Sequence, residues 1–184
     1  MNNELLPEEY PLSDNLVALE MIAMGGILKY CLRNIFINEE EGFADYGEFV
    51  YAIVDSSPER RWALLGTINI MSRSLLKNMK EANQTEYDNI LANLDRLDSS
   101  NPKDAKTGIK DGTVLMMSTE PIEAVLSDDW LIYISNKCPV ERYSGLMLML
   151  MSTCVSIVKE MAKIQNIEPL VLWDYATRQA NQYL

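Results

Sequence analysis

Histidine, the side chain most often used for acid–base catalysis near neutral pH, does not occur in this chain. Its absence excludes Ser-His-Asp and Cys-His nucleophilic sites and all histidine-ligated metals. The three cysteines, Cys31, Cys138 and Cys154, are one thiolate short of an all-cysteine structural zinc site. They are widely spaced among apolar neighbours, so we predict reduced, buried thiols in a cytoplasmic protein. One disulfide with a spare thiol is the alternative.

Carboxylates and thiols are the groups left for catalysis. Asp128-Asp129 and the glutamate run at 39–41 are paired acids, but adjacent residues splay apart rather than act on one proton. Cys138 precedes Pro139 at a predicted helix start, where the dipole lowers a thiol pKa, yet no imidazole is present as a base. We therefore predict that the protein is not an enzyme. A carboxylate- or thiol-dependent enzyme is the alternative.

Oxygen donors suitable for calcium occur in the polar segment 98–112. Its donors do not have the spacing of an EF-hand loop, and its lysines would oppose a cation. We predict a flexible polar loop there instead, with no metal site and no cofactor. Residues 1–12, which contain two prolines and no helical period, are predicted to be irregular.

Negative charge lies mainly in the first third of the chain. The net charge is 16 − 27 = −11, and residues 1–60 contribute 3 − 12 = −9. Such a field disfavours direct binding of nucleic acid or anionic membranes and attracts a basic protein surface. Simple solubility is the competing explanation. The residues predicted to bind a partner are Glu39, Glu40, Glu41, Asp45 and Glu48.

Apolar residues recur at helical spacing along six segments, which predicts an all-α fold in a single domain, 1–184. The expected helices cover 14–36, 43–54, 58–79, 85–97, 140–165 and a last segment from about 169. The acidic residues 37–42 are expected to form a turn. A minor two-stranded element near 113–135 is the exception: 113–118 and 130–135 either pair as a ribbon or are both helical.

Local signals refine the helix starts. Ser57 is expected to cap a helix whose first residue is Pro58, and Thr85 with Asp88 resembles a capping box. Arg60 and Arg61 lie in a first turn, where the helix dipole disfavours cations. We therefore expect one of them to have an acidic partner, with the glutamate run at 39–41 as the candidate.

Two adjacent glycines, Gly25-Gly26, interrupt the first predicted helix. Each costs about 1 kcal/mol relative to Ala in a helix interior. Their presence favours a close crossing by another helix, with a kink as the alternative.

The segment GLMLMLMSTC, residues 145–154, reads as a membrane insert, a soft copper site, an adaptable Met-rich surface, a strand or a core helix. Only sixteen uncharged residues separate Arg142 from Lys159, against the roughly 20 that a membrane-spanning helix needs. Helical spacing continues through residue 165. We therefore predict a core helix over 140–165, central to a bundle of about six helices.

These patterns favour a non-enzymatic cytoplasmic protein-interaction module. Its most specific form is an acidic inhibitor that occupies a basic, nucleic-acid-binding site on a partner protein. The alternative is an assembly subunit that forms a homo-oligomer through apolar helices. The last helix, which carries Trp173, is expected either to close the core or to dock on a second copy.

Overall fold

Six helices make up nearly all of residues 14–98 and 140–180, the part of the chain that the computed structural model describes, and no strand occurs there. The all-α prediction is confirmed. The irregular segment 1–12, the polar loop beyond Asp98, the predicted strands near 113–135 and Cys138 lie outside the described residues. The helices are α1 (Asp14–Ile37), α2 (Glu39–Val54), α3 (Pro58–Ala82), α4 (Gln84–Asp98), α8 (Val140–Gln165) and α9 (Pro169–Ala180).

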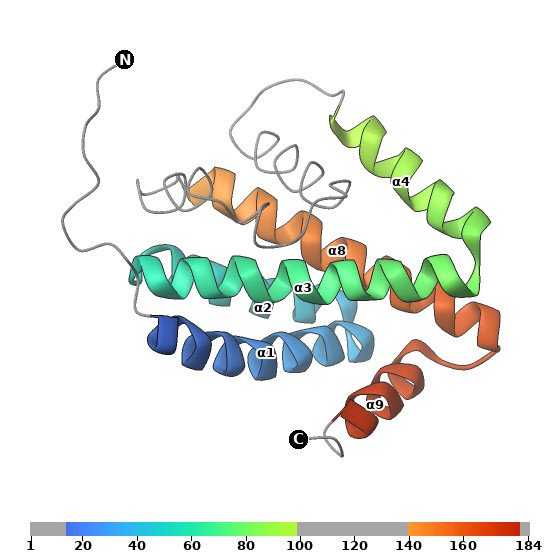
Figure 1. The fold of residues 1–184 in the computed structure, drawn as a ribbon, viewed down its shortest axis with the longest axis horizontal. Coiled ribbons are helices and arrows are strands. Elements are labelled where there is room, and N and C mark those ends of the chain that lie inside the picture. The colour runs from blue at the N-terminus through green and yellow to red at the C-terminus, as the bar shows by residue number, and fades with distance from the viewer. Residues whose placement is uncertain (1–13, 99–139, 181–184) are drawn as a thin grey trace.

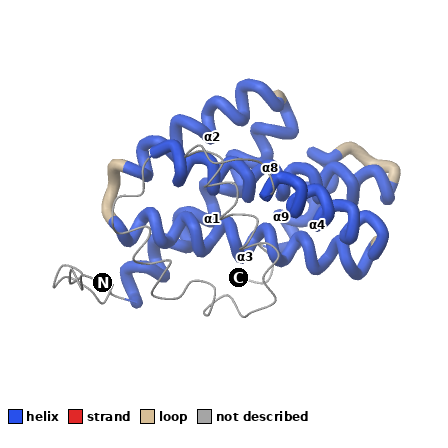
Figure 2. Tube along the Cα trace, turned by 90° about the horizontal axis from the view of Figure 1, so that it is seen from above, coloured by secondary structure: helices blue, strands red, loops and turns tan. Residues whose placement is uncertain are grey.

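The helices α1, α3 and α8 run in the same direction, and α2 runs in the opposite one, behind α3 in the view of Figure 1 and packed against α1 and α8. Asn38 alone joins α1 to α2, so these helices form a tight antiparallel hairpin. The helix α4 turns back along α3, and α9 folds back onto α1 (Figures 1 and 2). The helix α8 packs against α1, α2, α3 and α9.

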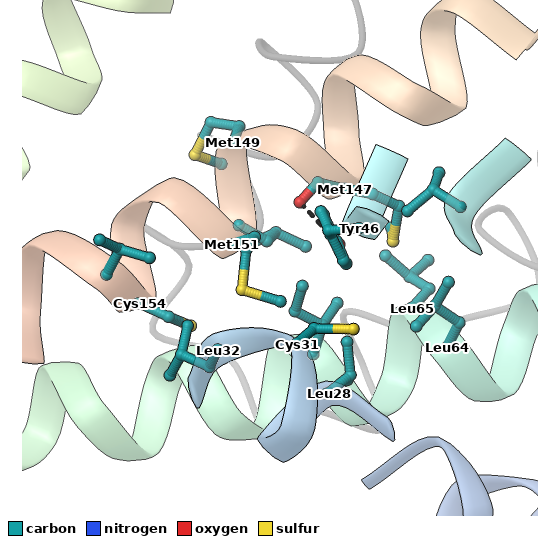
Figure 3. Packing of buried hydrophobic residues seen from close by; sticks show 14 of the residues in the cluster. Leu28, Cys31, Leu32, Tyr46, Leu64, Leu65, Met147, Met149, Met151 and Cys154 are labelled. Atoms are coloured by element: carbon teal, nitrogen blue, oxygen red, sulfur yellow. Dashed lines mark hydrogen bonds between the residues drawn. The ribbon is translucent and has the colours of Figure 1, made fainter. Parts of the chain in front are cut away.

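The predicted central helix is observed with bounds Val140–Gln165. It is buried over most of its circumference, and Met147, Met151 and Cys154 face leucines of α1 and α3, whereas Met149 points the other way (Figure 3). Met147, Met151 and Cys154 are fully buried, as expected of a helix surrounded by other helices. The strand interpretation of this segment is wrong.

Within the described residues, α8 is also the one helix long and apolar enough to span a membrane by length and composition. Length alone therefore does not exclude a span, contrary to our estimate from the uncharged residues. However, 67% of its apolar window is buried inside the protein, which is the behaviour of a core helix.

Two hydrogen bonds from tyrosine side chains to backbone carbonyls fix how the helices are placed along one another. Tyr46 on α2 donates to the carbonyl of Met147 on α8 at 3.1 Å. Tyr143 on α8 donates to the carbonyl of Arg61 on α3 at 3.0 Å. Both tyrosines are buried, so these bonds satisfy groups that would otherwise lose water at a cost of about 1–3 kcal/mol.

The helix α9 closes the core against α1, as one of the two expectations had it. The ring of Trp173 meets Phe36 edge-on at 6.4 Å between centroids, and its Nε1 donates to the Lys29 carbonyl at 3.1 Å. Arg33 forms an ion pair with Asp174 at 2.9 Å on the surface of this contact. At the end of α8, Asn166 adopts a left-handed conformation (φ 54°), which lets the chain turn back towards α9.

The start of α2 differs from the sequence prediction. The helix begins at Glu39 rather than near residue 43, because the Asn38 side chain caps it by accepting from the Glu41 N–H at 3.4 Å. The glutamates of the predicted turn form the first helical turn, where negative charge interacts favourably with the helix dipole. A helix start without apolar residues escapes periodicity analysis.

The cap of α3 is confirmed and that of α4 is not. Ser57 accepts from the Arg60 N–H, and Pro58 is the first residue of α3. In α4 the capping side chain is Asn83, which accepts from the Glu86 N–H at 3.2 Å, so Thr85 lies inside the helix. Asn is a stronger cap than Thr, which explains the earlier start.

The expected acidic partner of the first turn of α3 exists, but it is not the glutamate run. Arg60 pairs with Glu20 on α1 at 3.3 Å. Arg61 is buried and donates to the carbonyls of Val54 and Ser56 at 2.8 and 2.6 Å, which satisfies backbone acceptors at the end of α2.

The glycines also differ from expectation. A Cβ at Gly25 would meet only a Thr67 methyl group at 3.8 Å, and one at Gly26 would meet nothing within 4 Å. No close crossing by a described helix explains them. Packing does require a glycine at Gly42, because a Cβ there would lie 2.5 Å from the backbone of Ile35 in α1.

Candidate functional site

The five acidic residues predicted to bind a partner all lie on α2, which carries no basic side chain. The helical period separates them. Glu41, Asp45 and Glu48 are spaced by four and three residues, so they share one face of α2, and all three are exposed. We call these three residues the acidic row.

Glu39 and Glu40 do not join the acidic row. Glu39 points towards α8 and pairs with Lys159 at 2.7 Å. Glu40 is exposed and is rotated by about 100° from each of its two neighbours in the helix. The sequence places five acids in one cluster, whereas the helix presents three of them together.

Part of this negative charge stabilises the helix α2 itself. Glu39, Glu40 and Glu41 lie in the first turn of α2, where each acid contributes about 0.3–1 kcal/mol through the helix dipole. Asp45 and Glu48 lie beyond that turn and gain little from the dipole. Over residues 19–93 and 140–178, whose side chains the structure describes, no basic side chain forms an ion pair with any residue of the acidic row. The described side chains thus leave this charge without a basic partner.

Two of the three cysteines, Cys31 and Cys154, lie in the described residues, and both have free, buried thiols. Burial, assisted by the negative charge of Asp45, raises the pKa of Cys31 to about 11. Burial raises the pKa of Cys154 to about 12. Both remain protonated at neutral pH, the opposite of what a nucleophilic thiol requires.

Metal ligands do not gather in the described part of the chain: no three Cys, Asp or Glu residues there lie close enough to hold an ion. Of the methionine sulfurs considered for copper, those of Met147 and Met151 lie in the apolar core (Figure 3), and that of Met149 accepts a hydrogen bond from the Thr153 hydroxyl at 3.4 Å. Their observed role is to fill the core, for which the flexible methionine side chain is suited.

One buried polar residue escaped the sequence analysis. Asn69 on α3 is fully buried, and neither its amide nitrogen nor its oxygen has a hydrogen-bond partner among the described residues. The indole nitrogen of Trp62, two turns earlier on the same side of α3, is also without one. A polar residue within the apolar pattern of α3 was the available sequence signal.

Comparison with known proteins adds no function to this geometry. No protein-family model matches the chain, and neither a curated protein nor a solved structure matches it significantly.

Proposed function

We propose that this protein is a non-enzymatic interaction module that binds a basic surface of a partner protein through the acidic row on α2. The observation that carries the proposal is the exposure of Glu41, Asp45 and Glu48 on one helical face with no basic side chain of the described chain paired to them. Lysine or arginine side chains of a partner supply the missing counter-charge.

The spacing of the acidic row supports a specific role. Its carboxylates lie about one helical turn apart, so they project from one face at intervals of roughly 5–6 Å. A row of anions on a rigid helix suits a surface that normally binds the phosphates of a nucleic acid. We propose that the protein inhibits such a partner by occupying that surface, and that it does not bind nucleic acid or membrane itself.

The test combines charge reversal with a matched control. The triple variant Glu41→Lys, Asp45→Lys, Glu48→Lys changes the net charge from −11 to −5. The control variant Glu81→Lys, Glu141→Lys, Glu168→Lys makes the same change at exposed positions away from α2. Proteins retained from a lysate of the source cells are quantified for each variant at increasing salt.

We expect a basic protein to bind the wild type and the control and to lose at least about tenfold in affinity for the triple variant. Purified, that partner should release a labelled nucleic acid when wild-type protein is added, and keep it when the triple variant is added. Equal binding by the two variants, or binding that salt does not weaken, would contradict the proposal.

A cytoplasmic location belongs to the same proposal, since two free thiols suit a reducing compartment. The alternative, a homo-oligomeric assembly subunit, draws on a different observation: apolar side chains are exposed on α1. Sedimentation at several protein concentrations separates the two, since a strict monomer cannot serve as such a subunit.

A further inference from the structure

The helix α1 is buried on one side and exposes a row of apolar residues on the other. Leu19, Ile22 and Tyr30 are 65%, 75% and 63% exposed. With the exposed residues Ala23, Gly26 and Ile27 between them, they make up a surface that we call the α1 outer face. Single exposed apolar residues are ordinary, but a continuous row of them along one helix is typical of a binding surface.

The arrangement of these residues suits a second helix. Leu19, Ile22, Gly26 and Tyr30 are spaced by three, four and four residues, so they follow one line along α1. Gly26 lies in the middle of this line, exposed, with open space where a Cβ would be. An absent Cβ lets another backbone approach closely, which accounts for a glycine that the described fold does not require.

The acidic row borders the α1 outer face. The α1–α2 hairpin brings Gly42 against the backbone of Ile35, and Asp45 lies near enough to Cys31 to influence its thiol. Figures 1 and 2 show α1 and α2 side by side over their length, with α1 at the lower edge of the bundle in Figure 1. The opposite border, towards α9, carries Lys29 and Arg33, the latter paired with Asp174.

We infer that the α1 outer face and the acidic row together bind one amphipathic helix of a partner protein, with an apolar side and lysine or arginine along one edge. The apolar side of this helix covers Leu19, Ile22 and Tyr30, and its basic edge faces α2. The inference rests on the proposed function and specifies the partner: a basic helix rather than a flat basic surface.

Charge selects this occupant over a second copy of the chain. Two copies carry net charges of −11 each, so they repel one another over long range, whereas a basic partner is attracted. A basic amphipathic helix removes the apolar face from water and neutralises the carboxylates in a single contact.

The probes are three synthetic peptides of about 18 residues, long enough for some helicity in isolation. The first peptide consists of Leu and Lys spaced so that, as a helix, it carries all leucines on one side and all lysines on the other. The second has the same composition in scrambled order. The third contains only Lys and Ser. Fluorescence anisotropy measures binding to the full chain. We expect the ordered peptide to bind at least about tenfold more tightly than the scrambled one.

The variant Leu19→Ser, Ile22→Ser removes two exposed aliphatic side chains without changing charge. Its control, Ile70→Ser, Ile164→Ser, alters apolar residues that are 43% and 46% exposed on α3 and α8. We expect the first variant to lose the preference for the ordered peptide and the control to keep it. Circular dichroism of both variants verifies that the fold is retained.

The outcomes separate the two proposals. Equal binding of ordered and scrambled peptides, or equal effects of the two serine variants, overturns the helix-docking inference. The proposed function survives that result if the lysine triple variant still weakens binding of the Lys/Ser peptide, and falls if it does not. Concentration-dependent dimerisation that Leu19→Ser, Ile22→Ser abolishes would assign the α1 outer face to a second copy and overturn the inference as well.

Discussion

The helices α1 and α8 are both long and apolar, yet they are used differently. Both pack against four described helices: α8 against α1, α2, α3 and α9, and α1 against α2, α3, α8 and α9. The helix α8 is nevertheless buried on most sides, whereas α1 leaves Leu19, Ile22 and Tyr30 exposed on one face. Both helices contribute residues to the same core cluster. The difference shows that neither apolar composition nor the number of neighbouring helices fixes which faces remain available to a partner. Three predictions test this contrast.

The largest expected effect is the difference in the free energy of unfolding between a side-chain truncation to alanine in α8 and one in α1. Leu150→Ala in α8 removes a fully buried side chain, so it should lower the free energy of unfolding by about 2–5 kcal/mol. Ile22→Ala on the α1 outer face should change it by less than about 0.5 kcal/mol. Urea unfolding of both variants measures these values, and a loss of similar size in both would mean that the α1 outer face is covered.

Alanine substitutions of glycines in α1 and α2 should have the next largest effect on stability. Gly42→Ala should lower the free energy of unfolding by about 1–3 kcal/mol, because the added methyl group would collide with the α1 backbone at Ile35. Gly26→Ala on α1 and Gly47→Ala on α2 should each raise it by up to about 1 kcal/mol, since open space surrounds both positions.

Thermal and urea unfolding of the three glycine variants provide the measurement. A stabilised Gly42→Ala protein would show that α1 and α2 do not approach as closely as the structure has them. A destabilised Gly26→Ala protein would show that some other part of the chain already lies against the α1 outer face.

The smallest effect concerns the thiols. In a Cys138→Ser background, Cys31 of α1 and Cys154 of α8 should react slowly with a thiol reagent at pH 8 and rapidly in urea, because the pKa values of about 11 and 12 keep the folded thiols protonated. Cys31, the less deeply buried of the two, should react first as pH rises.

The free energy of unfolding should also depend on pH in the alkaline range where thiols ionise. Ordinary thiols ionise near pH 9, so above that value the unfolded chain loses protons that the folded chain retains, and the free energy of unfolding falls as pH rises. Rapid modification of Cys154 in the folded protein at pH 8 would show that α8 is not enclosed.

Much of the helical structure was predictable from spacing and caps. The bounds of α1 and α8 were predicted to within about one residue, because a continuous apolar period marks each of them. The start of α2 was missed although its signal was present: Asn38 followed by three glutamates is a favourable helix start that contains no apolar residue. Periodicity detects buried faces rather than the helix itself.

The candidate site was predictable only in part. The sequence located the negative charge on one segment, but treated five acids as one group. The helical period selected Glu41, Asp45 and Glu48, and the pairing of Glu39 with Lys159, 120 residues away, could not be read from local sequence. Glu20 as the partner of Arg60 was missed for the same reason.

The sequence by itself determined where the described helices lie and where the charge is concentrated, because backbone hydrogen bonding and side-chain periodicity act over a few residues. Only the tertiary structure decided which apolar faces are covered, why glycine is needed at Gly42, and which carboxylates of the described helices pair with a distant base, as Glu39 does with Lys159 and Glu20 with Arg60. These properties depend on contacts between helices that are distant in sequence, and hydrophobic burial, which drives those contacts, has no preferred direction along the chain.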